Sequence, residues 1–486
     1  MKNKILSLLP LVVLTITSCT KEEGQPLVAP TFEPTEGLSF TAYSGPRVAS
    51  GNIPNTLTDY HIQKVAEAGF NKMIALYDGA SGASANDTYE LIKKRSEKAE
   101  KDAMMALDIC ERYGIKYYVR DWSFYGLPKL YRYGFNPNIV TDEQYETVIA
   151  KMFDENNPYI HHNAYIGNFC CDEPTYEELD RVAVQVQLYQ KYLAKQGATG
   201  EALVNLYPDH VDSSGLSTEQ FVTYRQYVEH YCDLFSPLLN YICFDFYPFY
   251  DDPYEGSRMR ITYLNNLNLV ARIAKQYGLE MRTFLQCVGN WTGMRDMTSI
   301  GDFRFQIYSK MAFGSKEFIY YEYGNQYSEA EGGYGLFDFK TETYNFIYDL
   351  AKTVNNEVHC MEDAYLAYDW DGIMCKNASD ISTNVQFNYI KQDVLQSHPR
   401  VSFVDAEQDA IMGTFKNKKD GDDAFMLVNF NDPYMKLNNK VTLHFNNARG
   451  LLMYRLGQRM IVDLPASGNY TINLYPGEGR FIIPIK

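Results

Sequence analysis

Tyr165-Ile-Gly-Asn-Phe-Cys-Cys-Asp-Glu-Pro174 is the stretch of sequence that decides the fold. Its first six residues are mostly apolar or aromatic, which favours a strand that is covered on both faces. Pro174 ends this strand, and Thr175 and Glu178 behind it have the spacing of a helix capping box. A buried strand that leads directly into a helix is the repeating unit of a parallel α/β fold.

Two acidic residues, Asp172 and Glu173, stand together at the C-terminal end of this strand. Carboxylates at such a position are costly unless solvent, a partner or a substrate compensates them. In a parallel α/β barrel this end of the strands carries the chemistry. An ordinary acidic pair, favoured by the dipole of the following helix, would have the same sequence. The stretch alone leaves both interpretations open.

Strand-like and helix-like patterns alternate on both sides of this stretch. Eight β/α units between residues 37 and 357 predict a (β/α)8 TIM barrel with enlarged loops. A doubly wound sheet would also alternate, but no Gly-rich phosphate turn follows any of the strands. The other predicted strands are 37–43, 71–77, 116–121, 202–207, 241–247, 280–286 and 317–321. The predicted helices include 57–69, 87–113, one that begins at Ser217, 258–277, 302–313 and 341–356.

The sequence period changes at about residue 358. Short alternating segments such as 424–429, 440–445 and 470–474 are separated by Gly, Asn, Asp and Pro. This pattern predicts an antiparallel β-sandwich over residues 358–486, which serves as a packing or carbohydrate-accessory domain.

The N-terminal sequence predicts an export signal. Lys2 and Lys4 precede an apolar run, residues 5–16, that is too short to span a bilayer as a mature helix. The end of this run, Ile16-Thr17-Ser18-Cys19, resembles a bacterial lipobox, which implies a signal peptide of residues 1–18 and lipidation of Cys19. The following Thr20-Lys21-Glu22-Glu23 resembles the tag that directs some lipoproteins to the outer surface of the outer membrane. Residues 19–36 would then be a tether to the membrane, whereas a plain secretory signal would leave the protein in the periplasm.

Composition narrows the classes of function. The net charge is −16, and removal of residues 1–18 with their two lysines would make it −18. Because no basic run appears anywhere, nucleic acid is excluded as a partner. The 41 tyrosines suit sugar binding, since their rings stack on C–H faces and their phenols bond hydroxyls. Besides Cys19, eight cysteines lack any CxxC spacing, so we expect no structural zinc, no cofactor and few or no disulfides.

Carboxylates, amides and aromatic rings follow the predicted strands at their C-terminal ends, without a Ser/His/Asp set or an HExxH motif. Cleavage of a glycosidic bond needs such groups, because one carboxylic acid protonates the leaving oxygen and a second carboxylate stabilises or attacks the anomeric carbon. The predicted substrate-binding residues are Tyr43, Asp121, Trp122, Asp172, Asn205, Tyr207, Tyr247, Gln286, Trp291 and Tyr321.

The quoted stretch resembles the Asn-Glu-Pro acid/base motif of clan A glycoside hydrolases, with Asp172 in place of the asparagine. Asn205-Leu-Tyr-Pro, Asp245-Phe-Tyr-Pro and Pro476-Gly-Glu-Gly-Arg-Phe are similar to segments of bacterial barrel proteins related to family 42 β-galactosidases. The resemblance covers most of residues 37–486 and implies that Glu173 is the general acid/base. It also places the nucleophile on the seventh strand, where this chain has Gln286, an amide that cannot form the glycosyl-enzyme ester.

The second carboxylate must therefore come from elsewhere in an active enzyme. Asp245 is the first choice and Glu322, at the end of the eighth strand, is the second. The Asp172–Glu173 pair also resembles the one that family 20 hexosaminidases use for substrate-assisted cleavage. The sequence thus predicts an exported lipoprotein glycoside hydrolase that acts on oligo- or polysaccharides beside other glycan-utilisation proteins. The alternative, favoured by Gln286, is a non-catalytic glycan-binding lipoprotein on a decayed hydrolase barrel.

Overall fold

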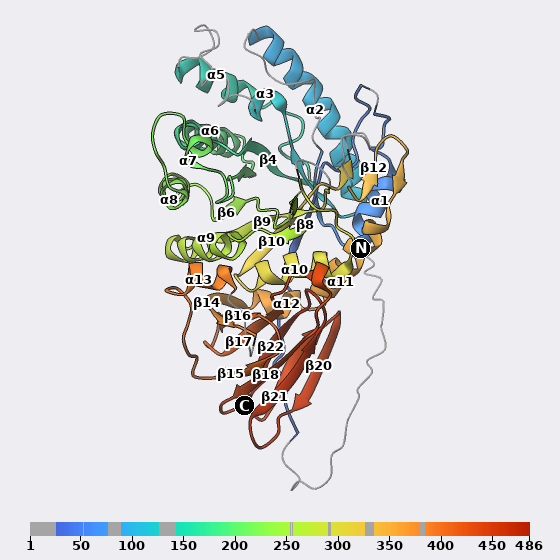
Figure 1. Cartoon of the computed structure of the whole chain (residues 1–486). Helices are drawn as coiled ribbons and strands as arrows, with labels where there is room; N and C mark the ends of the chain where they lie inside the picture. Colours follow the sequence, from blue (N-terminus) through green and yellow to red (C-terminus); the bar gives the residue numbers. More distant parts are fainter. Residues whose placement is uncertain are drawn as a thin grey trace.

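The computed structural model consists of a β/α barrel followed by a β-sandwich, which lies below the barrel in Figure 1. It describes residues 26–51, 53–75, 89–125, 142–252, 254, 256–289, 293–325, 335–378 and 384–486. The predicted signal peptide and Cys19 lie outside these residues.

Eight parallel strands form the barrel in the order β5-β4-β3-β2-β1-β10-β9-β6. The sheet closes between its two outer strands through Leu206, whose N–H donates to Cys243 O at 2.9 Å while Asp245 N–H donates to Leu206 O at 3.3 Å. The predicted TIM barrel is thereby confirmed. The strands are β1 (Ser39–Tyr43), β2 (Lys72–Ile74), β3 (Lys116–Val119), β4 (Tyr165–Asp172), β5 (Glu201–Asn205), β6 (Tyr241–Phe244), β9 (Glu280–Gln286) and β10 (Ser315–Tyr321).

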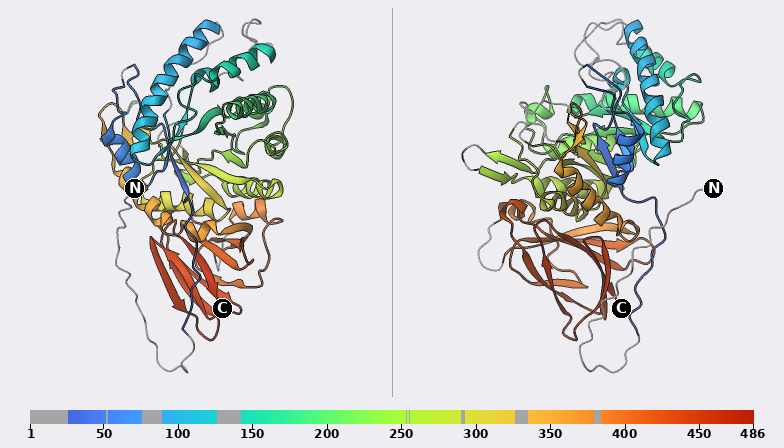
Figure 2. Two further views of the ribbon diagram at one scale, coloured as in Figure 1. Left: turned by 180° about the vertical axis from the view of Figure 1, so that it is seen from behind. Right: turned by 90° about the vertical axis from the view of Figure 1, so that its right-hand side faces the viewer.

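Helices follow the strands along the chain and surround the barrel (Figures 1 and 2). They are α1 (Asp59–Glu67), α2 (Tyr89–Arg112), α3 (Trp122–Tyr125), α5 (Asp142–Met152), α6 (Tyr176–Lys195), α7 (Ser213–Leu216), α8 (Tyr224–Phe235), α9 (Tyr263–Tyr277), α10 (Ile300–Met311), α11 (Phe346–His359) and α12 (Glu362–Leu366). The capping box predicted behind β4 is present, with Thr175 and Glu178 bonded reciprocally at the start of α6.

The predicted helix start at Ser217 is wrong. The Ser217 hydroxyl does accept hydrogen bonds from the N–H groups of Glu219 and Gln220, but the chain there forms a turn. The helix begins six residues later, where Thr223 and Gln226 form the capping box of α8. Two capping patterns follow each other in the sequence, and the second one lies next to the apolar period that packs on the barrel.

Two further features were not predicted. A hairpin of β7 (Phe249–Asp252) and β8 (Gly256–Met259) is inserted after β6. Between β10 and α11 lies a small sheet of β11 (Gly324–Asn325), β12 (Phe337–Asp338) and β13 (Thr343–Tyr344). Both insertions enlarge loops at the C-terminal end of the barrel strands.

Charged side chains fill part of the barrel interior. Glu317 accepts hydrogen bonds from Thr41 Oγ1 at 2.7 Å and from Lys72 Nζ at 2.8 Å. Arg282 lies 3.4 Å from Glu317 and donates to Glu201 at 2.5 Å. Because all of these groups have partners, the barrel interior contains a satisfied polar network.

The C-terminal part forms two antiparallel sheets, as predicted, with orders β14-β16-β17-β22-β19-β20 and β15-β18-β21. Helices give way to strands between α12 and β14, a few residues after the predicted boundary at 358. The strands are β14 (Tyr368–Lys376), β15 (Val401–Ala406), β16 (Ala410–Asn417), β17 (Asp423–Asn429), β18 (Asn439–Phe445), β19 (Gly450–Arg455), β20 (Gln458–Asp463), β21 (Asn469–Leu474) and β22 (Gly479–Ile485). Two short helices, α13 (Val385–Ile390) and η2 (Pro433–Met435), connect them.

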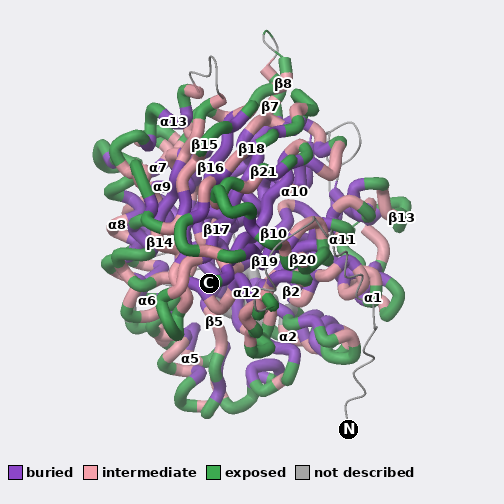
Figure 3. Tube along the Cα trace, turned by 90° about the horizontal axis from the view of Figure 1, so that it is seen from below, coloured by how far each residue is buried: buried purple, intermediate pink, exposed green. Residues whose placement is uncertain are grey.

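The sandwich packs on the barrel through α10. Gly413 on β16 lies so close to Ala312 that an added Cβ would meet the Ala312 backbone oxygen at 2.1 Å. Arg295, in the loop after β9, forms an ion pair with Asp432 of the sandwich at 2.8 Å. Buried residues run through both parts of the molecule in Figure 3. The eight cysteines from Cys110 to Cys375 are free thiols. Of the helices that the structure describes, none is long and apolar enough to span a membrane.

Candidate active site

The carboxyl ends of β4, β5 and β6 bring three polar residues together. Asp172 is the last residue of β4, Asn205 is the last of β5, and Asp245 follows β6 directly. Asp172 and Asn205 are paired in register, and Asn205 Nδ2 donates to Asp172 Oδ1 at 2.9 Å. Because neighbouring parallel strands end at the same rim, residues that are far apart in sequence meet there.

Glu173 has an unusual backbone conformation. Its φ is +51°, in the left-handed region that side chains other than glycine seldom adopt. Its N–H donates to Asn205 O at 2.8 Å, and the next carbonyl, Pro174 O, accepts from Tyr227 Oη at 2.7 Å. Such conformations persist where the surroundings fix them, and they cluster at functional sites. Here the surroundings turn Glu173 away from the line of the strand.

The side chains of Glu173 and Asp245 interact through a hydrogen bond that lowers the pKa of Asp245. Asp245 is 5% exposed and also bonds the side chain of Asn205. Its Oδ1 atom is buried and has no hydrogen-bond partner among the described residues. Since a carboxylate can only accept, the contact between two carboxyl groups requires a proton on one of them. Glu173 and Asp245 therefore form a pair that shares a proton.

Burial and the negative charge of Asp172 raise the pKa of Asp245 to about 7, while hydrogen bonds to Asn205 and Glu173 act in the opposite direction. A buried lysine lies behind the pair. Lys310 Nζ donates to Phe284 O at 2.5 Å and to Phe246 O at 3.5 Å. Burial lowers the pKa of Lys310 to about 7, although the charge of Asp245 opposes this shift. The pair is thus poised to exchange a proton near neutral pH.

Tyrosine rings line the space beside the acids. The centre of the Tyr43 ring lies 5.6 Å from that of Tyr321, which in turn lies 5.4 Å from that of Tyr247. Tyr43 Oη donates to Asp172 Oδ2 at 3.5 Å. Burial, followed by the charge of Asp245, raises the pKa of Tyr247. Tyr207, another predicted residue, is partly exposed, and its ring lies 6.4 Å from that of Tyr227. The structure therefore groups most of the predicted tyrosines around Asp172, Glu173 and Asp245.

Strand alternation places Arg120, and not Asp121, beside these tyrosines. The guanidinium carbon of Arg120 lies 4.4 Å from the centre of the Tyr125 ring, and its charge acts on Tyr43. Asp121 is buried on the opposite face, where burial and its charge raise the pKa of Glu100 on α2 to about 7. The prediction that Asp121 lines the mouth is therefore corrected, because successive side chains of a strand point to opposite faces.

Gln286 is buried and held by the backbone of two loops. Its Oε1 accepts from Phe249 N–H at 3.0 Å, and its Nε2 donates to Phe249 O at 3.1 Å and Arg295 O at 2.9 Å. These contacts come from the β6–β7 connection and from the loop after β9. The side chain at the seventh strand thus ties loops together, and both polar atoms of its amide already bond the protein backbone.

The remaining predicted residues are distributed differently. Glu322 is buried beside Cys287, where burial and then the charge of Glu322 raise the pKa of the thiol. Trp122 begins α3, but its side chain lies outside the described part of the structure, as does the whole of Trp291. Sequence reasoning assigned no role in the site to Arg120, Tyr125 or Lys310, because no pattern distinguishes them from residues that only stabilise the fold. Across the described ranges, no group of three or more His, Cys, Asp or Glu could hold a metal ion.

No protein-family model matches this chain, and no curated protein matches it. Solved structures do share its architecture. The β-galactosidase from Bacillus circulans sp. alkalophilus has a TM-score of 0.52 at 8% identity, over 91% of this chain and 100% of that chain. A GH42 β-galactosidase from G. stearothermophilus, determined as a catalytic mutant, has a TM-score of 0.51 at 8% identity, over 93% of this chain and 99% of that chain. At this identity the likeness shows the fold, which confirms the barrel architecture that the resemblance to clan A implied.

Proposed function

We propose that this chain is a glycoside hydrolase in which Glu173 is the general acid and Asp245 is its proton partner. The observation that carries the proposal is the hydrogen bond between these two carboxyl groups, with a pKa of about 7 for Asp245. A carboxyl group that keeps its proton near neutral pH is what protonation of a leaving glycosidic oxygen requires. The fold is compatible with this chemistry but does not by itself establish it.

The chemistry assigns a separate task to each acid. Glu173 donates the proton that it shares with Asp245 to the leaving oxygen as the glycosidic C–O bond breaks; a water molecule then attacks the anomeric carbon, and its proton returns to the Glu173–Asp245 pair. Asp172, held by Asn205 and Tyr43, supplies negative charge beside the sugar as positive charge develops on the anomeric carbon. Tyr43, Tyr247 and Tyr321 provide aromatic rings and phenol groups for an oligo- or polysaccharide substrate. Because the site is acidic, it favours an uncharged sugar over an acidic one.

The test compares substrates with good and poor leaving groups. Glu173→Gln should remove most of the turnover of alkyl glycosides and glycan fragments and much less of the turnover of aryl glycosides, because an acidic phenol needs little protonation. Asp245→Asn should lower both more evenly, by about 10²–10³-fold. The exposed Glu219→Gln is the matched control and should leave the turnover of both kinds of substrate unchanged. Unchanged turnover of a natural glycan by Glu173→Gln would refute the assignment.

The buried Gln286 favours a second candidate, a non-catalytic glycan-binding protein, because the carboxylate that clan A carries on this strand is absent. In that case the wild-type chain binds glycans without turnover. Isothermal titration of glycan fragments, followed by product analysis after long incubation, separates the two functions. Binding with no released sugar would favour the second candidate.

We further propose that the protein is an outer-membrane lipoprotein anchored through Cys19, facing the cell surface beside other glycan-utilisation proteins. The lipobox-like sequence before Cys19 and the acidic Thr20–Glu23 segment support this. Cys19→Ser should move the protein from the membrane fraction to the soluble fraction. Equal incorporation of labelled fatty acid into the wild type and the variant would contradict the anchor, and protection from added protease on intact cells would indicate the periplasmic face.

A further inference from the structure

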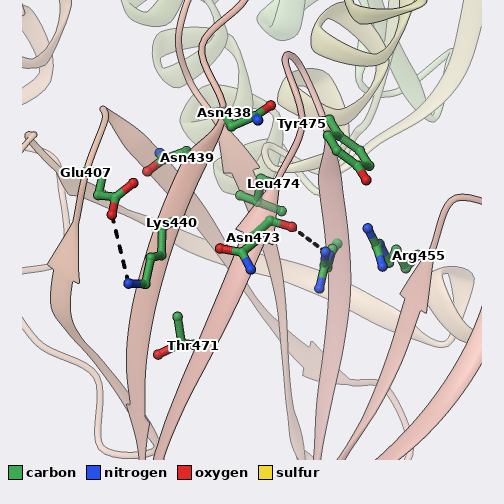
Figure 4. Close-up of a pocket in the computed structure, with 10 residues that line it drawn as sticks. Glu407, Asn438, Asn439, Lys440, Arg455, Thr471, Asn473, Leu474 and Tyr475 are labelled. Carbon is green, nitrogen blue, oxygen red and sulfur yellow. Dashed lines mark hydrogen bonds and ion pairs between the residues drawn. The ribbon is translucent and has the colours of Figure 1, made fainter.

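A polar pocket lies on the C-terminal sandwich, on a different domain from the tyrosine-lined site. Its volume is about 480 Å³, within the range of roughly 300–1,000 Å³ that is typical of small-molecule sites. Figure 4 shows Tyr475 and Arg455 at one end of it and Glu407 with Lys440 at the other. Its remaining lining residues are Asn438, Asn439, Thr471, Asn473, Leu474 and Arg480.

Two arginines share one buried carboxylate at the inner end of this pocket. Glu478 is fully buried, and its Oε1 lies 3.0 Å from Arg480 Nε and 3.4 Å from Arg455 Nε. Its Oε2 accepts from Tyr475 N–H at 2.8 Å. Arg480 is buried and also donates to Asn473 O. The cluster therefore contains two positive charges and one negative charge, which Glu478 shares between the two guanidinium groups.

Arg455 lines the pocket and belongs to a cluster with one excess positive charge. Its Nε atom is buried and makes no hydrogen bond among the described residues, and its side chain is 32% exposed. At the other end Lys440 and Glu407 are balanced by each other at 4.0 Å, both half-exposed. The pocket thus has an excess of positive charge on a chain of net charge −16. A partly desolvated guanidinium is a carboxylate-binding group.

The groups around Arg455 suit a sugar better than a bare anion. The guanidinium carbon of Arg455 lies 5.6 Å from the centre of the Tyr475 ring, which is 48% exposed and offers an aromatic face. Along the floor, Thr471 and Asn473 alternate on the outward side of β21, and they present a hydroxyl and an amide. A ring face, neutral hydrogen-bonding groups and one cation together match the C–H face, the hydroxyls and the carboxylate of one sugar residue.

We propose that this pocket binds a uronic acid residue of an acidic glycan, with its carboxylate on Arg455 and its ring on Tyr475. The sandwich then acts as a second glycan-binding site that holds an acidic polysaccharide independently of the barrel. This assignment does not depend on catalysis by Glu173, because binding at the sandwich would persist in a protein whose barrel is inactive.

Isothermal titration of the full-length protein tests the proposal. The probes are oligogalacturonate, oligoglucuronate, methyl-esterified oligogalacturonate and inorganic phosphate, each with wild type, Arg455→Gln, Tyr475→Ala and Arg459→Gln. We expect at least one uronate probe to bind, the methyl ester to bind at least tenfold more weakly, and phosphate not to compete. Arg455→Gln and Tyr475→Ala should each weaken uronate binding at least tenfold. Arg459→Gln, an exposed arginine on the neighbouring strand, should change it less than twofold.

Several outcomes would overturn the proposal: neither uronate binds, the methyl ester binds as tightly as the acid, or phosphate competes at equal concentration. Unchanged affinity in both Arg455→Gln and Tyr475→Ala would do the same. Tyr475 is exposed, so its variant should fold even if Arg455→Gln disturbs the cluster around Glu478. A Glu173→Gln background keeps the two proposals apart, since loss of turnover there should leave uronate binding intact.

Discussion

The carboxyl groups of Glu173 and Asp245 are in hydrogen-bond contact at the carboxyl end of the barrel. Retaining glycosidases hold their two carboxyl groups about 5–5.5 Å apart, and inverting enzymes hold them about 6.5–9.5 Å apart. A direct hydrogen bond is shorter than either separation. As they stand, these two groups do not flank a sugar carbon; they share a proton and act together as the proposed proton donor, with Asp172 as the carboxylate beside the anomeric carbon.

The shared proton predicts an effect of pH on stability. The pKa of Asp245 is raised from 3.8 to about 7 in the folded protein. Its contribution to stability is therefore fully present below pH 4 and is lost as the pH rises from about 4 to 7. Asn at this position cannot ionise. Relative to the wild type, the free energy of unfolding of Asp245→Asn should therefore rise by on the order of 4 kcal/mol as the pH rises from about 4 to 7.

Urea denaturation of both proteins between pH 4 and 8 measures this difference. The exposed Asp463→Asn is the control and should follow the wild type at every pH. Parallel curves for Asp245→Asn and the wild type would show that Asp245 ionises normally in the fold, and the proton-sharing pair would then be wrong.

The contacts of Gln286 predict that a carboxylate cannot simply be restored to the seventh strand. In Gln286→Glu, the carbonyl oxygens of Phe249 and Arg295 would face a buried carboxylate in place of an N–H donor. We expect a loss of more than about 3 kcal/mol in stability and no gain in turnover. Chemical denaturation and glycoside assays measure both, with the exposed Gln187→Glu as the control. A stable variant with higher turnover would mean that Gln286 faces the substrate.

Strands and helices could be predicted because their local signals agree with the tertiary structure. The seventh strand was predicted at residues 280–286 and is β9, Glu280–Gln286, since Gly278 ends the preceding helix and a buried strand follows at once. The helix start at Ser217 failed because a capping pattern also occurs in isolated turns. Its correct position depends on which face packs on the barrel, and that is a tertiary property.

The site was predicted less completely, for two physical reasons. The sequence places Arg120 and Asp121 at the same strand end, but it does not say which one faces inward. That phase is set by Tyr118, which contacts Glu201 and Arg282 inside the barrel. The second reason is that contacts from other parts of the chain decide what Gln286 and Lys310 do. The groups that bond Gln286 and Lys310 come from residues far away in sequence, so neither role leaves a local pattern.

Gly167, in the stretch that decides the fold, should not tolerate a side chain. A Cβ there would lie 1.9 Å from Glu201 O and 2.5 Å from Glu201 N, both backbone atoms of the adjacent β5. Gly167→Ala should therefore destabilise the protein by about 3 kcal/mol or more. Gly114→Ala, with φ +72° and open space around it, should cost only about 1–2 kcal/mol for its backbone conformation. Equal thermal midpoints for the two variants would contradict a close approach of β5 to Gly167.

Turnover should be unaffected by chelation of metal ions. The groups assembled around Glu173 are carboxylates, amides and phenols that already bond one another, such as Asn205 with Asp172. Incubation with EDTA followed by assay on an aryl glycoside is the measurement, with added Mg²⁺, Ca²⁺ and Zn²⁺ in parallel. Loss of turnover that one of these ions restores would assign a metal to the reaction.

The polar network inside the barrel should affect stability and leave the chemistry unchanged. Glu317 binds Lys72 at 2.8 Å and lies 3.4 Å from Arg282, and all three side chains are almost fully buried. Glu317→Gln would leave two buried cations beside a neutral amide, and we expect a loss of about 3–5 kcal/mol. The exposed pair Arg225–Glu229 provides the control, since Arg225→Gln should cause no measurable change.

The Glu317→Gln variant should keep its turnover. Glu317 lies near the middle of β10, whereas the proposed proton donor, Glu173, follows the end of β4. Turnover per folded molecule should therefore stay near the wild-type value, measured below the unfolding transition. If folded Glu317→Gln lost turnover, the polar network inside the barrel would be coupled to the Glu173–Asp245 pair, and the two could not be treated as independent.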